Sequence, residues 1–352
     1  MNSEDFKKRK AEINHGFDEI FDEFQKSKDE IQRIHTIAEN TNQILDDLDE
    51  QFCGQTGLTK TDMAFLFLAL GLQVARQYLL TNNTGRLTAP QGDQLIHNIL
   101  PRDYREILTQ SVPYDAVKTG SHVFDTGLSG NTHRYRTLGH DPIFGWVFGT
   151  ANILTNSLTK TNFETYQVSN MMIIRHYPMG VVGMLNQAVQ YSIEDPKRLV
   201  AAVIRQAVHL GSDFFTKQGL PIPGVAIANN TLAQKMLINW HIDMWSITRG
   251  ATLSAFINCI ITAIHRLFFK GESVTDQKLY EVRTKKIISY SNLIASSSNI
   301  AVTAITRDFN KLDIGGIAVS IYRLITDAKF IRQVKEDFIF GSYKKMILEN
   351  DF

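Results

Sequence analysis

Cysteines, long runs of charged residues and long runs of apolar residues are all scarce in this chain, and each scarcity counts against certain classes of protein. Two cysteines among 352 residues, Cys53 and Cys259, cannot build a disulfide framework, and no CxxC pair or zinc-finger spacing of Cys and His occurs. Lys and Arg are scattered rather than clustered, so composition does not imply nucleic-acid binding. The first residues are charged and lack the short apolar core of a signal peptide. We therefore expect a cytoplasmic protein, with peripheral or conditional contact with an inner membrane as the alternative.

The common catalytic motifs are absent as well. The sequence contains no GxxxxGK[ST] loop, no GxGxxG after a strand, and no GxSxG, HExxH or HxxEH. A P-loop, a dinucleotide fold and the familiar hydrolase and metalloprotease signatures are therefore unsupported, and no motif identifies a reaction.

Uncharged apolar segments are shorter than a membrane span. The most apolar one, 62–80, has ten uncharged residues from Met63 to Leu72, whereas a spanning helix needs about 20 apolar residues. Segments beginning at Gly145, Gly250 and Ala295 mix apolar residues with Gly, Ala and Ser, and each contains an Asn. Small residues permit close helix packing in membranes and in soluble cores. We expect core helices, and membrane contact stays open.

A heptad repeat of apolar residues runs through the first 50 residues. Its positions follow alternating steps of four and three, and its apolar members are Ile13, Phe17, Ile20, Phe24, Ile31, Ile34, Leu45 and Leu48. Ser27, Ala38 and Thr41 fill the intervening positions and weaken the repeat without breaking its register. No proline interrupts it, and a 3.5-residue spacing keeps one stripe of a helix facing a partner helix. The pattern predicts a long N-terminal coiled-coil arm over 1–55, followed by a helical body over 56–352. It leaves open whether the arm pairs with a second copy, giving a homo-oligomer, or folds back on the body.

Charge is divided unevenly between these parts. The formal net charge is +1, but residues 1–50 hold seven basic and fourteen acidic groups, whereas the remainder holds 30 basic and 22 acidic groups. An acidic arm and a basic body can attract each other, or the body can attract a nucleotide or another anionic ligand.

The body is predicted to be helical almost throughout, which makes the fold class all-α. Asp195 and Pro196 form a cap and first-turn pair that opens a helix. Helices are expected at 62–80, 93–100, 102–110, 195–217, 231–248, 250–269, 275–306 and 316–337. Strand signals at 171–174 and 181–182 are too short to predict a sheet.

The clearest candidate site lies in a predicted long loop at 111–142. Long connections are uncommon in compact domains and are often functional. This one contains His133, His140 and Asp141, whose side chains are suitable ligands for a divalent transition metal. Arg134 and Arg136 lie between them and suit an anionic ligand.

A second pair of candidate ligands lies further along the chain. His209 and Asp213 are four residues apart on the predicted helix and so share one face. Docked against the loop, they would complete a metal site able to activate water for hydrolysis. The structural alternative is that Asp141 caps a helix beginning at 143, that His140 covers this cap, and that the other groups form ordinary polar pairs.

Two segments carry a family resemblance. LGHDPIFGWVFGTANILT at 138–155 and DFFTKQGLPIPG at 213–224 resemble segments of uncharacterised bacterial all-helical proteins from mobile or phage-defence islands. The resemblance implies an accessory or antiviral effector protein rather than a housekeeping enzyme, and it assigns no functional residue.

Three functions follow from these observations. The heptads, the charge split and the small-residue helices favour an oligomeric, non-enzymatic effector that is membrane-associated or pore-forming and controlled by an anionic ligand. The first alternative is a metal-dependent hydrolase that uses His133, His140, Asp141, His209 and Asp213. The second is a structural adaptor.

Overall fold

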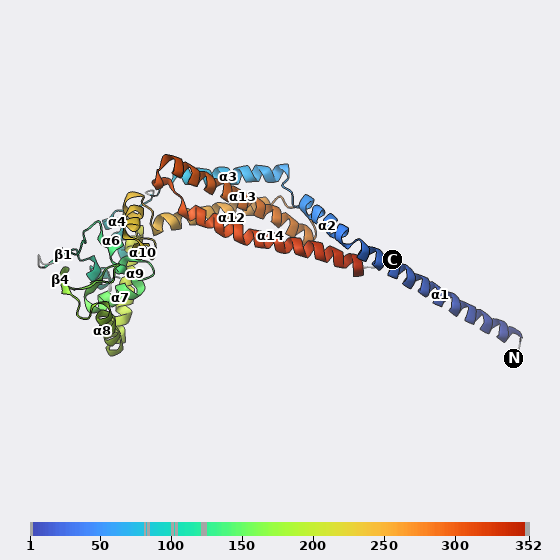
Figure 1. Cartoon of the computed structure of the whole chain (residues 1–352), viewed down its shortest axis with the longest axis horizontal. Helices are drawn as coiled ribbons and strands as arrows, with labels where there is room; N and C mark the ends of the chain where they lie inside the picture. Colours follow the sequence, from blue (N-terminus) through green and yellow to red (C-terminus); the bar gives the residue numbers. More distant parts are fainter. Residues whose placement is uncertain are drawn as a thin grey trace. The chain divides into compact units, whose positions relative to one another are not determined.

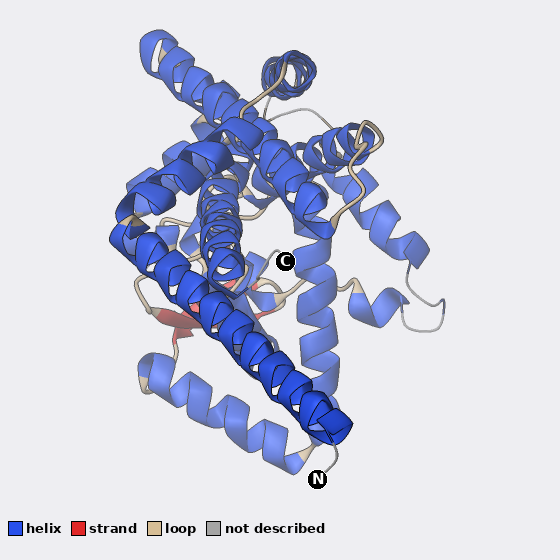
Figure 2. Cartoon of the chain, turned by 90° about the vertical axis from the view of Figure 1, so that its right-hand side faces the viewer, coloured by secondary structure: helices blue, strands red, loops and turns tan. Residues whose placement is uncertain are grey.

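The computed structural model of the chain describes residues 3–348 apart from 81, 83–84, 100–101, 103–104 and 121–124. The fold is all-α, as predicted, and helices dominate both views of the chain (Figures 1 and 2). The chain divides into two compact units. Unit 1 comprises 1–65, 263–287 and 324–352, and unit 2 comprises 66–262 and 288–323.

Unit 1 contains the N-terminal helices α1 (Ser3–Glu39) and α2 (Thr41–Gln55). Four further helices contribute residues to both units: α3 (Lys60–Leu79), α12 (Met244–Arg266), α13 (Val274–Thr306) and α14 (Ile314–Leu348). In unit 1, Phe52 of α2 packs against Leu279 and Val282 of α13 and Val334 of α14. Unit 1 groups residues 1–65 with two distant segments, whereas the sequence predicted a boundary at residue 55. That predicted boundary stays a prediction.

The heptad positions of α1 and α2 differ in burial. Ile13, Phe17 and Ile31 are exposed at 58%, 67% and 70%, whereas Leu48 is buried. Near the end of α1, Arg33 donates to the carbonyl oxygen of Ile347 at 3.0 Å. The last part of the repeat therefore belongs to the core of unit 1, and most of the α1 stripe faces outward. The predicted coiled coil is not seen in a single chain and stays a prediction.

Unit 2 holds the remaining elements. Its short helices are α5 (Arg105–Leu108), η2 (Pro113–Asp115), α6 (His133–Arg136), η3 (Leu138–His140), α10 (Val225–Ala228), α11 (Asn230–Gln234), η4 (Lys235–Asn239) and η5 (Phe309–Lys311). Its longer ones are α4 (Ala89–Ile99), α7 (Gly145–Thr155), α8 (Gly180–Glu194) and α9 (Pro196–Phe215). Helix α9 confirms the prediction from Asp195, whose side chain accepts a hydrogen bond from the Lys197 amide at 3.0 Å.

Several predicted boundaries were wrong. The helices expected to meet at 249 instead break near His241, which has a positive φ of 50°, and α12 runs through Gly250. The stretch 111–142 is not a plain loop, because η2, β1, α6 and η3 lie within it. Its residues 121–124 lie outside the described part of the chain, as do residue 100 of the helix predicted at 93–100 and residues 103–104 of the helix predicted at 102–110.

The prediction that no sheet forms was also wrong. Four short strands, β1 (Lys118–Thr119), β2 (Ser157–Thr159), β3 (Thr165–Ser169) and β4 (Met172–His176), pair in the order β1-β4-β3-β2. Strand β1 is parallel to β4, and the other pairs are antiparallel. Asn170 and Met171 join β3 to β4 with positive φ angles of 45° and 57°, which suits a two-residue hairpin. The turn sequence is Asn-Met rather than the Asn-Gly that usually predicts such a hairpin.

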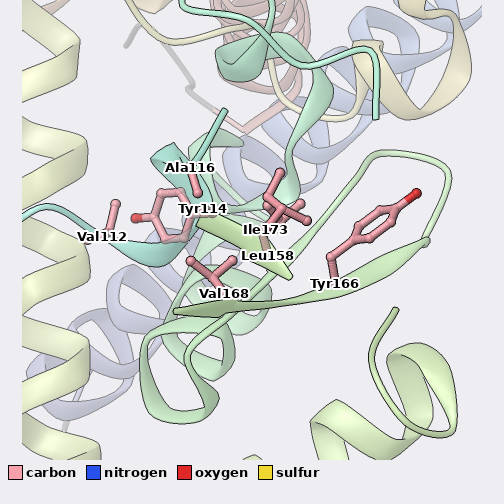
Figure 3. Close-up of a cluster of buried hydrophobic side chains, with 7 residues drawn as sticks. All are labelled: Val112, Tyr114, Ala116, Leu158, Tyr166, Val168 and Ile173. Atoms are coloured by element: carbon pink, nitrogen blue, oxygen red, sulfur yellow. The ribbon is translucent and has the colours of Figure 1, made fainter. Parts of the chain in front are cut away.

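The sheet and η2 enclose a small hydrophobic cluster. Its members are Val112, Tyr114, Ala116, Leu158, Tyr166, Val168 and Ile173 (Figure 3). Tyr114 is fully buried, and its hydroxyl donates to Oε1 of Gln206 on α9 at 2.5 Å. This bond ties η2 to α9, and it fixes the position of Asp115, the next residue.

A candidate metal centre

Three polar side chains from separate elements of unit 2 converge on one point. Asp115 ends η2, His140 ends η3 and His209 lies on α9. Asp115 Oδ1 is 3.0 Å from His140 Nε2 and 3.4 Å from His209 Nε2, and the two Nε2 atoms are 3.3 Å apart. In a tetrahedral site with bonds near 2.05 Å, neighbouring ligand atoms are about 3.3 Å apart. The spacing of these three atoms therefore suits a shared divalent cation.

The orientation of His140 is set by a threonine. The Thr137 hydroxyl donates its single proton to the His133 carbonyl oxygen at 2.9 Å, so it accepts a hydrogen bond from Nδ1 of His140 at 2.7 Å. The proton position follows from this network rather than from observed hydrogens. Burial lowers the pKa of His140 to about 4, even though Asp115 opposes the shift. Neutral His140 therefore presents the lone pair of Nε2 to the cluster, as a metal ligand must.

His209 carries the positive charge that this arrangement needs. Burial disfavours its charged form, but Asp115 and Asp213 outweigh burial and raise the pKa of His209 to about 9. Burial likewise opposes ionisation of Asp115, but the positive charge of His209 holds the pKa of that carboxyl well below its usual range. At neutral pH a proton on His209 Nε2 lies between a carboxylate and a neutral imidazole, where a metal ion could replace it.

Asp213 lies at the edge of the cluster. Its Oδ2 is 3.5 Å from His140 Nε2 and 3.4 Å from His209 Nε2, and it is buried without a hydrogen-bond partner in the described part of the chain. Its Oδ1 accepts a hydrogen bond from Arg134 at 2.7 Å, and the same guanidinium donates to the Thr216 hydroxyl at 2.6 Å. A buried carboxylate oxygen without a donor is suited to accept a hydrogen bond from a molecule that enters the site.

His133 lies farther out than the other two histidines. Its Nε2 is 3.9 Å from Asp115 Oδ1, and its Nδ1 is 3.1 Å from the carbonyl oxygen of Ser129. It borders the cluster and is not among the three groups that converge.

Two further sequence-predicted residues lie elsewhere. The carboxylate of Asp141 accepts hydrogen bonds from the amides of Ile143, Phe144 and Gly224 at 2.9, 2.9 and 2.7 Å. These bonds hold the turn that leads into α7, but they do not cap a helix at 143 as the alternative predicted, because α7 begins at Gly145 with Phe144 at its N-cap. Arg136 donates to the carbonyl oxygen of Gly127 at 2.9 Å. Neither residue is brought to the cluster.

A small cavity adjoins the candidate metal centre. It has a volume of about 190 Å³, and its lining includes Asp115, Arg134, His209, Asp213 and Thr216. This volume is below the roughly 300–1,000 Å³ of typical ligand pockets. It suits a small molecule or one end of a larger one.

Asp115 was missed by the sequence analysis. It lies in the stretch 111–142 that was expected to hold a site, but it is at least 18 residues along the chain from each histidine of the predicted site, so no short motif links them. Only the folding of η2 against α9, through Tyr114 and Gln206, places it beside His209. A site assembled from three separate segments has no sequence signature short enough to recognise.

No family model, curated protein or solved structure matches the chain. The assignment of a function therefore depends on the chemistry of these residues.

Proposed function

We propose that unit 2 is a metal-dependent hydrolase that acts on a small substrate or on the exposed end of a larger one. The observation that carries this proposal is the convergence of Asp115, His140 and His209 beside the 190 Å³ cavity. Two imidazoles and one carboxylate form a mixed N/O donor set that suits Zn²⁺, Fe²⁺ or Mn²⁺ and leaves coordination positions open.

The residues of the cluster have separable roles in this proposal. Asp115, His140 and His209 hold the cation. A divalent metal at such a site supplies Lewis-acid chemistry and lowers the pKa of water to near neutrality. Asp213 lines the cavity and is free to accept the proton of an attacking water through Oδ2, while Arg134 holds its other oxygen. Arg134 also lines the cavity, where its charge favours an anionic group on the substrate.

The proposal is tested by metal-dependent turnover. Protein loaded with Zn²⁺, Mn²⁺ or Fe²⁺ is assayed against chromogenic carboxylic esters, phosphoesters and aminoacyl amides. We expect turnover of one class that a chelator abolishes and added metal restores. Asp213→Asn should lower kcat by roughly 10²–10⁴-fold, the usual contribution of a general base, while metal stays bound.

A matched control separates the site from general damage. His35 is an exposed histidine of α1, so His35→Ala should leave turnover unchanged. Metal-loaded protein that hydrolyses none of the three classes would contradict the hydrolase assignment while leaving a metal site in place.

A further inference from the structure

The parts of α3, α12, α13 and α14 that belong to unit 2 have a polar interior. Buried polar side chains there include Gln73, Ser254, Asn258, Asn292, Ser296 and Ser320. Gln73 and Asn292 both donate to Oδ1 of Asn258, at 3.1 and 2.8 Å. The hydroxyls of Ser296 and Ser320 are 2.6 Å apart. The four helices are thus joined inside by amide and hydroxyl hydrogen bonds as well as by apolar contacts.

A buried ion pair lies in the same interior. Arg76 of α3 donates to Asp313, just before α14, at 2.5 Å, and both side chains are less than 10% exposed. Arg76 also donates to the Gly250 carbonyl of α12 at 3.2 Å. A Cβ at Gly315 would lie 2.1 Å from the Ile247 carbonyl oxygen, so α12 and α14 approach as closely as glycine allows.

The outside of these helices is apolar. Exposed side chains include Phe67, Leu72, Phe256, Leu293, Ile300 and Ile321, with Phe256 at 60% and Ile321 at 54%. They come from all four helices. A partner helix would cover one apolar stripe, whereas exposed apolar side chains on all four helices suit a solvent that is itself apolar.

This distribution is the reverse of that in a water-soluble bundle, which buries its apolar faces and exposes its polar ones. Inside a bilayer, helices turn small and polar residues toward one another, pair buried charges and turn apolar side chains toward lipid. We propose that these segments of α3, α12, α13 and α14 lie in the hydrocarbon layer of a lipid bilayer.

The two longest of these segments, in α12 and α13, agree with this environment, whereas those of α3 (66–79) and α14 (314–323) are shorter. Residues 288–306 of α13, its part in unit 2, contain no Asp, Glu, Lys or Arg, and at 1.5 Å per residue they cover about 28 Å, close to the thickness of the hydrocarbon core. Among the described residues, α12 is a single helix that is both long enough and apolar enough to cross a membrane. Its mean hydropathy is 1.4 over a window of 18 residues, and only 22% of that window is buried. The pair α2 and α3, bent by 60°, reaches the same level only if read as one span.

The test is flotation of the full-length protein with vesicles of phosphatidylethanolamine and phosphatidylglycerol. We expect the protein to float with the vesicles. Phe256→Arg and Ile300→Arg should each lower the floating fraction at least tenfold, since Arg is costly within hydrocarbon. Ile193→Arg is the matched control: Ile193 is 75% exposed on α8, outside these helices, and its substitution should change nothing.

A second readout reports contact with lipid directly. Fluorophores on Phe256→Cys and Ile300→Cys, with the exposed Cys53 and Cys259 replaced by Ser, should be quenched by lipids brominated in the acyl chain. A fluorophore on Ile193→Cys should not. Protein that stays at the bottom of the gradient with unquenched labels overturns the proposal. Labels shielded in a discrete lipid-free oligomer also overturn it, and they assign the apolar surface to other copies of the chain.

This inference does not depend on the proposed hydrolase. Flotation needs no metal, and metal binding by Asp115, His140 and His209 needs no vesicles, so either can fail without the other.

Discussion

Thr137 is the residue whose effect on the metal centre is easiest to isolate. It contacts His140 Nδ1 and is not among the three groups that converge on the cluster. Its single hydroxyl proton is committed to the His133 carbonyl, which leaves the proton of His140 on Nδ1 and the lone pair on Nε2. We class it as a positioning residue, because it selects the tautomer that can bind metal.

We predict that Thr137→Val weakens metal affinity by roughly 10–100-fold, as loss of such outer contacts usually does. The affinity is measured by isothermal titration calorimetry, and the His140 tautomer by ¹⁵N NMR, where the Nδ1-protonated form should be lost. Thr306→Val is the control, since the Thr306 hydroxyl donates to the Val302 carbonyl and accepts from the Asp308 amide, neither of which belongs to the cluster. Unchanged affinity together with an unchanged tautomer would contradict the role.

Metal binding should release a proton from His209. Since the pKa of His209 is about 9 in the metal-free protein, the imidazole is protonated at pH 7.5 and must lose that proton to bind a cation. Calorimetry in buffers of different ionisation enthalpy should report about one proton released per ion at pH 7.5. Affinity should fall about tenfold per unit as pH decreases from 8 to 6. Release of no proton at pH 7.5 would contradict this charge state.

Without metal, His209 should also make stability depend on pH. Its folded pKa of about 9 lies above the ordinary 6.5, so its contribution is fully present below pH 6.5 and is lost as pH rises through 9. His140 acts in the opposite sense, because its folded pKa of about 4 makes stability fall as pH drops from 6.5 to 4. Urea unfolding followed between pH 4 and 10 should show a maximum near pH 6.5. His209→Asn should remove the alkaline decline.

At the scale of elements, sequence patterns predicted the long helices better than the short pieces. Helix α9 followed from Asp195 and Pro196 because a cap and a first-turn proline act locally. The strands did not follow, because β4 pairs with β1, which lies more than 50 residues earlier, and its two-residue turn lacks glycine. Asp115 was missed for the same reason. Its position depends on tertiary contacts of η2 that no nearby residue encodes.

The packing of η3 against η2 gives an element-scale prediction. A Cβ on Gly139 would lie 2.5 Å from Cγ of the buried Tyr114 ring, which has no room to move. We expect Gly139→Ala to lower the free energy of unfolding by about 1–3 kcal/mol, as overpacking does. Urea unfolding of metal-free protein measures it. Gly130→Ala is the control, because a Cβ there meets nothing within 4 Å, and equal effects of the two substitutions would contradict the packing argument.

At the scale of the whole molecule, the exposed stripe of α1 is an apolar surface that a single chain leaves uncovered. Phe17, Ile20 and Phe24 are 67%, 65% and 64% exposed, although the heptad pattern places them on one face. Of the two arrangements that the sequence left open, pairing between copies is the one that would cover them. Leu48, near the end of the same repeat, is buried within unit 1. The repeat is therefore exposed over its first part and buried at its end.

We predict that deletion of residues 1–31 converts an oligomer into a monomer, because the cut removes most of the exposed part of the repeat and spares the buried Leu48 and Phe52. Light scattering of both proteins in mild detergent gives their masses without interference from other apolar surfaces. Phe17→Ser with Phe24→Ser in the full-length chain should have the same effect. A full-length monomer, or an oligomer that survives the deletion, would contradict pairing through the arm.

The most direct test of the central claim is the metal content of the full-length protein. After metal loading and dialysis, mass spectrometry should find about one divalent transition-metal ion per chain. His140→Ala and His209→Ala should each reduce this to less than a tenth, while His35→Ala, the exposed control on α1, should retain it. Protein that binds no metal, or that binds it equally in all three variants, would contradict a metal centre at Asp115, His140 and His209.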